Sequence, residues 1–448
     1  MVHLDRRQIA ATASAAVVGA VAGAVLTAPT AGGDVFGFSV DPPGFPLDST
    51  PTAIAVGGLV ALAVVSASRR IRVAVVGMTI GAVILVGAAL FDAPAVVRTI
   101  GAGGVLGGIV AITRTDPRRS AFTGTVAGFV LGSFVVPALG TIRRREDPTP
   151  RRYADYLPSR GSVTVFAGDR VLVVGAALVV IAVVLLAVTL RPRLSEPIRR
   201  PPARPAAIAA MVLVAGALVF WWFLRWISSS MTSATGLHTF LGGYLLVAVA
   251  IVVAVATPGR RGLVWLAAVA AVASHGADGA SASGAVEAAV IAGLIALGAT
   301  VAILTSGRDD GRRAPAAVCA ALIALTILTA SQFLDGDTSS MIPAFAGIFL
   351  VPVVVGATLV AAVRGDARPH GATVVGALVA LPLLTRTTGT SAGWTAYTPL
   401  TDAEGFSGFG DLSYAATTTT AIVSAVITTS ACAAVAVVLL RRSPATAD

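Results

Sequence analysis

The sequence lacks the charge that a water-soluble protein carries on its surface. Only 12% of its 448 residues are charged and 56% are hydrophobic, whereas soluble domains contain about 25% charged residues. No segment between the apolar runs reaches the ~50 residues that a small soluble domain needs. The composition therefore excludes water as the solvent for most of the surface. It also excludes a separate soluble catalytic domain.

Lysine is missing and cysteine is nearly so. All 32 basic residues are arginine, and the two cysteines, Cys319 and Cys432, lie inside apolar segments. We therefore expect no structural disulfide, and no His/Cys spacing indicates a metal site or a cofactor. The net charge of +10 could suggest nucleic acid. Arginines in short loops between apolar segments instead set the orientation of a membrane protein, so no nucleic-acid partner is predicted.

Apolar segments are what the sequence does contain, at a mean hydropathy of +0.87. A hydrocarbon core of about 30 Å requires about 20 apolar residues in a helix. Backbone groups in lipid must be satisfied within each segment, which favours helices. The sequence predicts an all-α, polytopic integral membrane helix bundle of about 14 transmembrane helices. The predicted spans are 9–28, 51–68, 73–91, 94–113, 120–140, 171–190, 206–225, 238–256, 262–280, 285–305, 314–334, 341–363, 371–388 and 414–440.

The distribution of arginine predicts the orientation. With the N-terminus inside, about 22 of the 32 arginines fall on the inner side, so both termini are predicted to be cytoplasmic in a plasma membrane. The loop 141–170 is an exception. It carries seven arginines, yet the number of preceding spans places it outside.

One segment divides the chain. Residues 191–205 (RPRLSEPIRRPPARP) are too rich in proline for a continuous helix. We expect an extended cytoplasmic linker there, between an N-terminal segment of about six helices (1–190) and a C-terminal segment of about eight (206–448).

Glycine and proline indicate how the spans are built. Three pairs or triplets of glycine recur at four-residue spacing, which allows close helix packing in lipid; they are Gly77 with Gly81, Gly103 with Gly107, and Gly124 with Gly128 and Gly132. Pro343 and Pro352 lie in one span and predict a kinked or interrupted helix. Broken helices form substrate sites in many transporters and also occur in ordinary bundles.

Ionisable residues near the outer ends of the spans are the candidate site residues. Charged groups at membrane depth face a cavity or one another unless they reach the interface. The candidates are Glu287 for proton or cation coupling, Arg98 for an anionic group, Asp278 with His275 as a gate, and Asp92. Together they suggest an outward-facing polar vestibule. The simpler alternative is that each side chain extends to the interface.

The first outer loop suggests a different function. Asp34, Asp41 and Asp48 lie there among aromatic residues and prolines. Their arrangement resembles that of membrane glycosyltransferases acting on polyprenyl-phosphate sugars, which implies a carboxylate base. The arginines of 141–170 would then hold a phosphate. The alternatives to a transporter are thus a transferase acting on a lipid-linked substrate at the outer face, or a non-catalytic scaffold subunit.

The sequence favours a transporter-like protein over an enzyme, and no catalytic residue is assigned. The predicted partners are the lipid bilayer and a small-molecule or lipid-linked substrate. The identity of the substrate and the oligomeric state stay open.

Labelling of the loop 141–170 tests the predicted topology. Single cysteines between residues 147 and 165, in a variant with both native cysteines replaced by alanine, should react with a membrane-impermeant maleimide added to intact cells. Reaction only after permeabilisation would mean that a span in the first 140 residues is miscounted.

Overall fold

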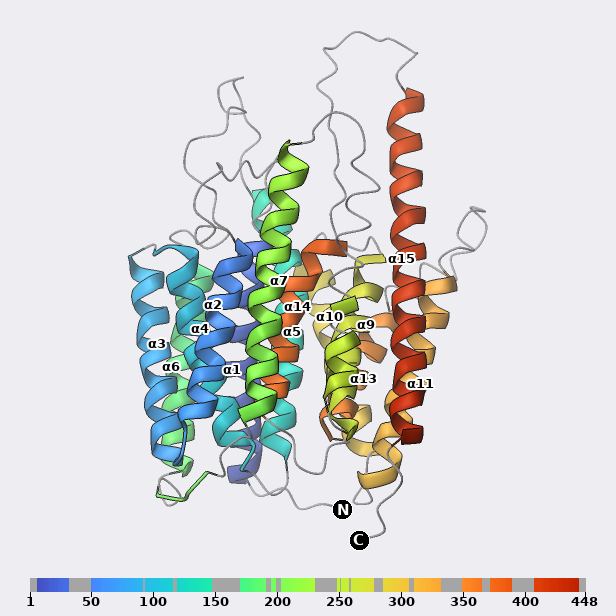
Figure 1. Cartoon of the computed structure of the whole chain (residues 1–448). Helices are drawn as coiled ribbons and strands as arrows, with labels where there is room; N and C mark the ends of the chain where they lie inside the picture. Colours follow the sequence, from blue (N-terminus) through green and yellow to red (C-terminus); the bar gives the residue numbers. More distant parts are fainter. Residues whose placement is uncertain are drawn as a thin grey trace, which may run out of the picture.

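A computed structural model describes most of the chain. The described residues are 6–31, 50–91, 93–115, 119–146, 170–190, 195–198, 203–229, 248–249, 251–257, 259–277, 285–305, 310–331, 349–364, 371–388 and 407–442. Within them the protein is almost entirely helical, and the helices run side by side as one bundle (Figure 1). The predicted polytopic membrane helix bundle is confirmed.

The helices follow the predicted spans closely. Their bounds are α1 (Arg6–Ala31), α2 (Thr50–Ala67), α3 (Ile71–Leu90), α4 (Ala95–Thr113), α5 (Ser120–Glu146), α6 (Arg170–Leu190), α7 (Ala203–Ser229), α9 (Gly262–Ala277), α10 (Ala285–Thr305), α11 (Asp310–Ser331), α13 (Val351–Arg364), α14 (Gly371–Thr388) and α15 (Ser407–Arg442). A short 3-10 helix, η4 (Gly259–Arg261), precedes α9, and residues 251–256 are also helical. Among the described residues, seven helices are long and apolar enough to cross a membrane on their own.

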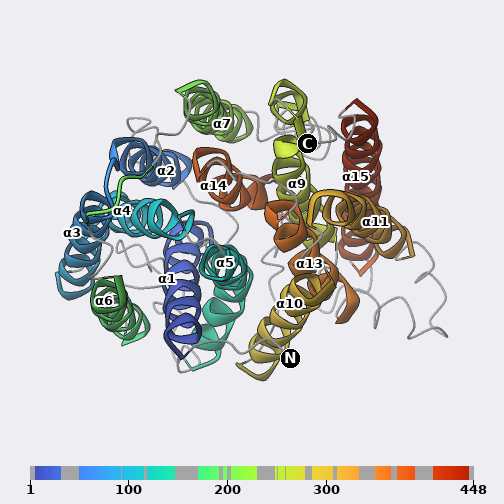
Figure 2. The ribbon, with the colours of Figure 1, turned by 90° about the horizontal axis from the view of Figure 1, so that it is seen from below.

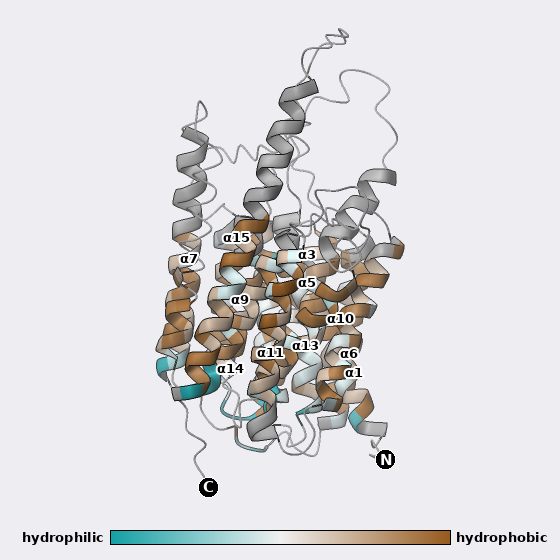
Figure 3. Ribbon diagram, turned by 90° about the vertical axis from the view of Figure 1, so that its right-hand side faces the viewer, coloured by the Kyte–Doolittle hydropathy of each residue, from teal (hydrophilic) through white to brown (hydrophobic). Residues whose placement is uncertain are grey.

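Large apolar side chains cover the outside of the bundle. On α3, Val76, Ile80 and Val83 are 49%, 56% and 65% exposed, and α6 exposes Ile181 and Val184 to a similar degree. Such continuous exposure is unfavourable in water and is normal for surfaces in contact with lipid tails. The helical walls are correspondingly apolar in Figure 3. The protein is therefore a multi-pass membrane protein embedded in a bilayer.

Arginines whose side chains are described gather at one end of the bundle. We name the end at which α1 begins and α15 ends the terminal face (Figure 1). Hydrophilic residues gather toward this face in Figure 3. The described arginines at the helix ends there are Arg69, Arg70, Arg72, Arg114, Arg119, Arg204, Arg260, Arg261, Arg364 and Arg441. The end of α5 and the start of α6 lie at the opposite face; the predicted outer side of the loop 141–170 stays a prediction.

Small residues allow α1 and α5 to pack with their backbones in contact. A Cβ atom at Gly124 would lie 2.9 Å from the carbonyl oxygen of Thr12. At Gly128 and Gly132 it would collide with the carbonyl oxygens of Ala16 and Ala20. In lipid, helices associate through such packing because the hydrophobic effect does not act between them. The predicted packing role of this glycine triplet is confirmed.

The other two glycine pairs pack in the same way. A Cβ at Gly81 would lie 2.6 Å from the backbone nitrogen of Val105, and one at Gly77 would press on Val64. Gly103 and Gly107 bring α4 against α2, where Gly103 meets the backbone of Gly57. Helix α4 therefore lies at the centre of the first six helices, in contact with α1, α2 and α3 (Figure 2).

The helix contacts repeat along the chain. In the first six helices, α1 packs on α5 and α6, α4 packs on α2 and α3, and α3 packs on α6. In the same order, α9 packs on α14 and α15, α13 packs on α10 and α11, and α11 packs on α15. Because α1 and α9 both start at the terminal face, the two units have the same orientation. We name α1–α6 the first repeat and α9–α15 the second repeat.

The two repeats meet along related helices. Helix α5 of the first repeat packs on α10, and its counterpart α14 packs on α2 (Figure 2). Helix α7 also packs on α2 and α14. It lies outside the set of helix pairs that the two repeats share among the described residues. The predicted division at 191–205 into segments of about six and eight helices stays a prediction.

Part of the predicted linker is ordered on the first repeat. The backbone N–H of Ile198 donates to the carbonyl of Arg69 at 2.8 Å, and that of Ile71 donates to Glu196 at 3.4 Å. These bonds pair residues 195–198 with the short turn between α2 and α3. Helix α7 begins at Ala203, within the last three residues of the predicted linker, because the first turn of a helix tolerates Pro205.

Two helices extend beyond their predicted ends. Helix α5 continues to Glu146, so Arg143–Arg145 are helical and are not part of a loop. Helix α15 begins at Ser407, which makes Asp411 helical as well. Hydropathy failed at these ends because polar residues can continue a helix beyond the hydrocarbon core.

A matched pair of glycine substitutions tests the packing of α1 on α5. Gly128→Ala should lower the free energy of unfolding of the detergent-solubilised protein by about 1–3 kcal/mol, because the added Cβ meets the Ala16 carbonyl. A lower unfolding temperature is the expected readout. Gly293→Ala on α10 is the control, since a Cβ there meets nothing within 4 Å and alanine favours helix. Thermal unfolding followed by size-exclusion chromatography measures both. Equal stability of the two variants would contradict the packing argument.

Candidate functional site

A buried arginine lies near the opposite face of the bundle. Arg98 is in the first turn of α4 and is only 7% exposed. Placing a guanidinium in such a position requires polar surroundings, because an unsolvated charge is strongly unfavourable. The helix that carries it is also the most enclosed of the seven long apolar helices. Of the residues predicted as a site, Arg98 is the one whose side chain the structure describes as buried.

Thr27 on α1 lies at a similar level of the bundle to Arg98 on α4. A Cβ at Gly57 would lie 2.6 Å from the Thr99 carbonyl oxygen and 2.8 Å from a Leu26 methyl group. Arg98 precedes Thr99 and Thr27 follows Leu26 in the chain, so Arg98 and Thr27 lie at a similar level of the bundle on α4 and α1.

Ser133 adds a polar group from α5. Its Oγ would lie 3.0 Å from a Cβ at Gly23, one turn before Thr27 on α1. Thr27 is 1% exposed and Ser133 5%, and the Ser133 hydroxyl has no hydrogen-bond partner among the described residues. We name Thr27, Arg98 and Ser133 the polar band. Thr27 and Ser133 were not predicted from the sequence, although polar residues within stripes of small residues were an available signal.

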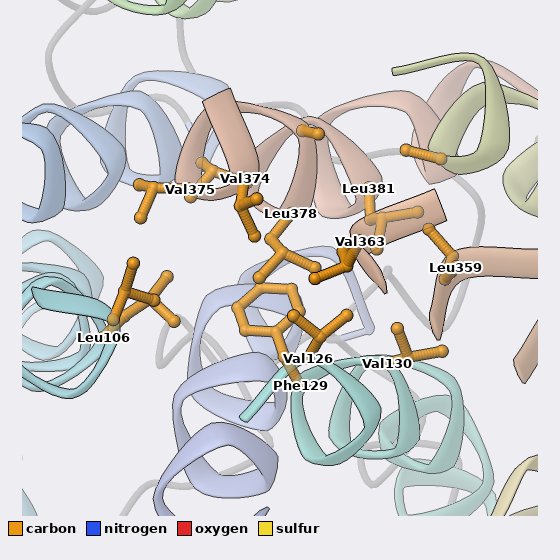
Figure 4. Packing of buried hydrophobic residues seen from close by; sticks show 14 of the residues in the cluster. Leu106, Val126, Phe129, Val130, Leu359, Val363, Val374, Val375, Leu378 and Leu381 are labelled. Carbon is orange, nitrogen blue, oxygen red and sulfur yellow. The ribbon is translucent and has the colours of Figure 1, made fainter. Parts of the chain in front are cut away.

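An apolar cluster joins the two repeats on the terminal side of this band. Figure 4 shows side chains of α4, α5, α13 and α14 pointing toward one another, each at most 2% exposed. We name this cluster the apolar plug; it consists of Leu106, Val126, Phe129, Val130, Leu359, Val363, Val374, Val375, Leu378 and Leu381. Its residues on α13, and those on α14 except Leu381 near the middle of that helix, lie in the half of each helix nearer the terminal face. Among the described residues, the interface between the two repeats is therefore closed on the side of the terminal face.

Three hydroxyl groups beside the plug are bonded within their own helices, whereas the buried hydroxyl of Thr373 on α14 has no partner among the described residues. Thr113 donates to the Ile109 carbonyl at 2.7 Å, and Thr125 donates to Ala121 at 3.0 Å. Thr358 on α13 likewise donates to Val354 at 2.6 Å. Such bonds leave little donor capacity for a ligand, since a hydroxyl has one hydrogen to give. The plug residues themselves are thus an apolar barrier.

Arginines form a polar layer between the plug and the terminal face. Nη1 of Arg119 donates to the Arg364 carbonyl at 3.3 Å, and Nη1 of Arg364 donates to the Ile303 carbonyl at 2.7 Å. Arg114, just beyond the end of α4, is half-buried, and this desolvation lowers the pKa of its guanidinium. The first of these bonds connects the first repeat to the second.

The remaining predicted site residues lie where side chains are not described. Glu287 is in the first turn of α10 and His275 is near the end of α9, but neither side chain is among the described ones. Asp92 and Asp278 lie outside the described residues, as do Pro343 and the outer vestibule that these charges suggested.

Pro352, the second of the two candidate kink residues, lies within the described residues. Pro352 lies in the first turn of α13, where its missing N–H costs no intrahelical bond. The two residues before α13, Phe349 and Leu350, are π-helical, a geometry often found where a helix is irregular.

No metal centre can be assembled from the described residues. Within those ranges, no three His, Cys, Asp or Glu side chains lie close enough to hold an ion. Cys319 and Cys432 are both buried and free. The described residues thus place a buried cation and hydroxyls on one side of an apolar barrier, and arginines on the other.

Solved structures resemble this fold along nearly its whole length. The proton:xylose symporter XylE of the major facilitator superfamily (MFS), bound to 6-bromo-6-deoxy-D-glucose, aligns with a TM-score of 0.50 at 13% identity. The alignment covers 98% of this chain and 96% of that one. The MFS transporter FucP in the outward conformation aligns with a TM-score of 0.48, 13% identity and coverage of 98% and 100%.

Sequence comparison adds no relative. No protein-family model matches this chain, and no curated protein matches it. The comparison with XylE therefore shows a shared fold of the helix bundle.

Proposed function

We propose that this protein is a transporter that moves a small organic anion across the membrane by alternating access between its two repeats. One observation carries the proposal: two parallel six-helix repeats meet at an apolar plug, with a buried arginine on one side of it. In transporters built from parallel repeats, substrate sites lie near the midplane at the repeat interface, and one repeat rocks against the other.

The position of the plug defines which side is closed. Its residues lie between the polar band and the terminal face, so a substrate from the opposite face would be stopped at this barrier. Opening would separate α4 and α5 from α13 and α14. Those helices contribute to the plug from different repeats, which makes rigid-body motion sufficient to open it.

We further propose that the terminal face is cytoplasmic and that the bilayer is the plasma membrane. Ten arginines whose side chains are described lie at the helix ends of that face, in agreement with the preference of cytoplasmic loops for positive charge, although Arg143–Arg145 and Arg170 lie at the opposite one. The plug would then close the protein toward the cytoplasm and leave the polar band on the outer side.

Composition favours an anion over a sugar as the substrate. Sugar sites need several amide or charged groups that hydrogen-bond to hydroxyls. This chain contains no asparagine and only two glutamines, Gln8 in the first turn of α1 and Gln332 just after α11 in the sequence. Arg98 offers a guanidinium that binds carboxylate or phosphate in a bidentate way. The hydroxyl of Ser133 is available beside α1 as a further donor.

The other predicted residues receive roles within this proposal. Glu287 is at the start of α10, which packs on α5 across the repeat interface, and there it would couple transport to a proton or cation. His275 at the end of α9, together with Asp278 and Asp92, would form a gate near the opposite face. The transferase interpretation depends on Asp34, Asp41 and Asp48, which lie outside the described residues, and no described contact favours it.

Electrical recording from proteoliposomes tests the substrate class. Solid-supported membrane electrophysiology with a panel of C3–C6 carboxylates and a panel of hexoses should give currents with at least one carboxylate. Arg98→Gln should reduce that current by at least about tenfold, the effect of losing one charged hydrogen-bonding partner. Arg441→Gln, which removes the same charge from an exposed position on α15, is the control.

Two outcomes would contradict parts of the proposal separately. Currents with hexoses alone would reject the anionic substrate and leave transport intact. A full response of the Arg98→Gln protein to the carboxylate would remove Arg98 from the site.

Substitution of Glu287 tests coupling. Glu287→Gln should abolish accumulation against a gradient while the protein reaches the membrane at the normal amount, because the amide cannot exchange a proton. Uptake of the carboxylate identified by electrophysiology, normalised to membrane abundance by quantitative immunoblotting, measures this effect. Unchanged accumulation would exclude Glu287 as the coupling residue.

A further inference from the structure

The two repeats are connected at the terminal face by hydrogen bonds from arginines to the ends of helices. Arg119, immediately before α5, donates to the backbone carbonyl of Arg364, the last residue of α13. Arg364 in turn donates to the carbonyl of Ile303, near the end of α10. Each acceptor belongs to the last turn of a helix, where carbonyls lack intrahelical donors and the helix dipole is negative. A cation is therefore favoured at both positions.

A second contact repeats this geometry on the other side of the interface. Helix α4 corresponds to α13 in the contact pattern, and Arg114 follows its end as Arg364 ends α13. The Cδ atom of Arg114 would lie 3.6 Å from a Cβ at Gly371, the first residue of α14. The end of α4 thus touches the start of α14, and the end of α13 is bonded to the start of α5. The terminal face is closed by a pair of contacts that follow the internal repeat.

The backbone of Arg119 indicates that its position is imposed by these contacts. Its φ angle is 55°, which makes it the single non-glycine residue with positive φ in the described chain. The left-handed conformation is unfavourable for a residue with a Cβ, by about 1 kcal/mol or more. At the same time its carbonyl accepts hydrogen bonds from the N–H and the hydroxyl of Thr123, which start α5. A residue held in a strained conformation must be stabilised by its surroundings.

We propose that Arg119 is a positioning residue that latches the two repeats together at the terminal face, with Arg364 fixing the carbonyl that it binds. This inference rests on the proposed alternating access. It adds the group that stabilises the state in which the terminal face is closed. Separation of α5 from α13 breaks the Arg119–Arg364 bond. The Arg364–Ile303 bond lies within the second repeat, between α13 and α10, and survives the motion.

The latch and the plug act on the same boundary in different ways. The plug excludes water and solutes through close packing of apolar side chains, which are in contact over a large area. A hydrogen bond from a charged donor is directional and is lost over a small displacement. The latch therefore sets how readily the terminal face opens, and the plug sets how tightly it is sealed.

Distance measurements between spin labels test the latch without a substrate. In a variant with Cys319 and Cys432 replaced by alanine, one label pair at Ala67→Cys and Thr305→Cys reports on the terminal face. A second pair at Phe91→Cys and Val286→Cys reports on the opposite face. All four positions are exposed, and each pair joins the two repeats.

Two substitutions of Arg119 are compared with a charge-matched control. Arg119→Gly removes the guanidinium and relieves the positive φ, so folding should be preserved. Arg119→Gln provides a second variant with a side chain of intermediate length. Arg441→Gln removes the same charge from the exposed end of α15. Both Arg119 variants should increase the population of long distances at the terminal face by about tenfold or more. At the opposite face they should leave the distances unchanged or shorten them, and the control should change neither pair.

Each other outcome overturns the latch. Unchanged distances at the terminal face in both Arg119 variants would show that the bond does not hold the repeats together. Broadening at both faces would show general loosening of the fold, so that Arg119 would have only a structural role. Because these measurements need no substrate, failure of the latch leaves the proposed transport intact, and absence of currents in proteoliposomes leaves the latch result valid.

Discussion

Close contact between helix backbones is the constraint on which the rest of this structure depends. In lipid, apolar side chains gain nothing by leaving one apolar environment for another, so helices associate where their surfaces fit closely. Gly128 and Gly132 bring α5 onto α1, and Gly103 brings α4 onto α2. This packing places α4 at the centre of the first repeat. It consequently determines the burial of Arg98 and the direction in which Leu106 points into the apolar plug.

The repeat organisation gives the interface its properties. Helices α4 and α5 of one repeat face α13 and α14 of the other, and their shared surface is apolar along the plug and polar at the arginine layer. An interface of two preformed bundles can open by a small rotation, because the close packing within each bundle is retained. The packing of α7 on α2 and α14 adds a helix to one of the two seams between the repeats.

The sequence predicted the fold class well because the signals involved are local. Each span can be recognised from about 20 consecutive apolar residues, and the bounds of α10 and α14 agree with the predicted 285–305 and 371–388. The functions of the glycine stripes were also predictable, since four-residue spacing alone places residues on one helical face. The predictions failed where polar residues extend a helix, as at Glu146 and Ser407.

Sequence alone determined that this is a polytopic membrane protein, with arginines concentrated on one side and Arg98 as a charge at membrane depth. Only the tertiary structure decided which helices meet. The internal repeat is invisible in the residues, because packing requires small or apolar side chains at a position and accepts many of them. The polar band, the apolar plug and the bond from Arg119 to Arg364 join residues far apart in the chain. Their assembly depends on the three-dimensional arrangement of the helices.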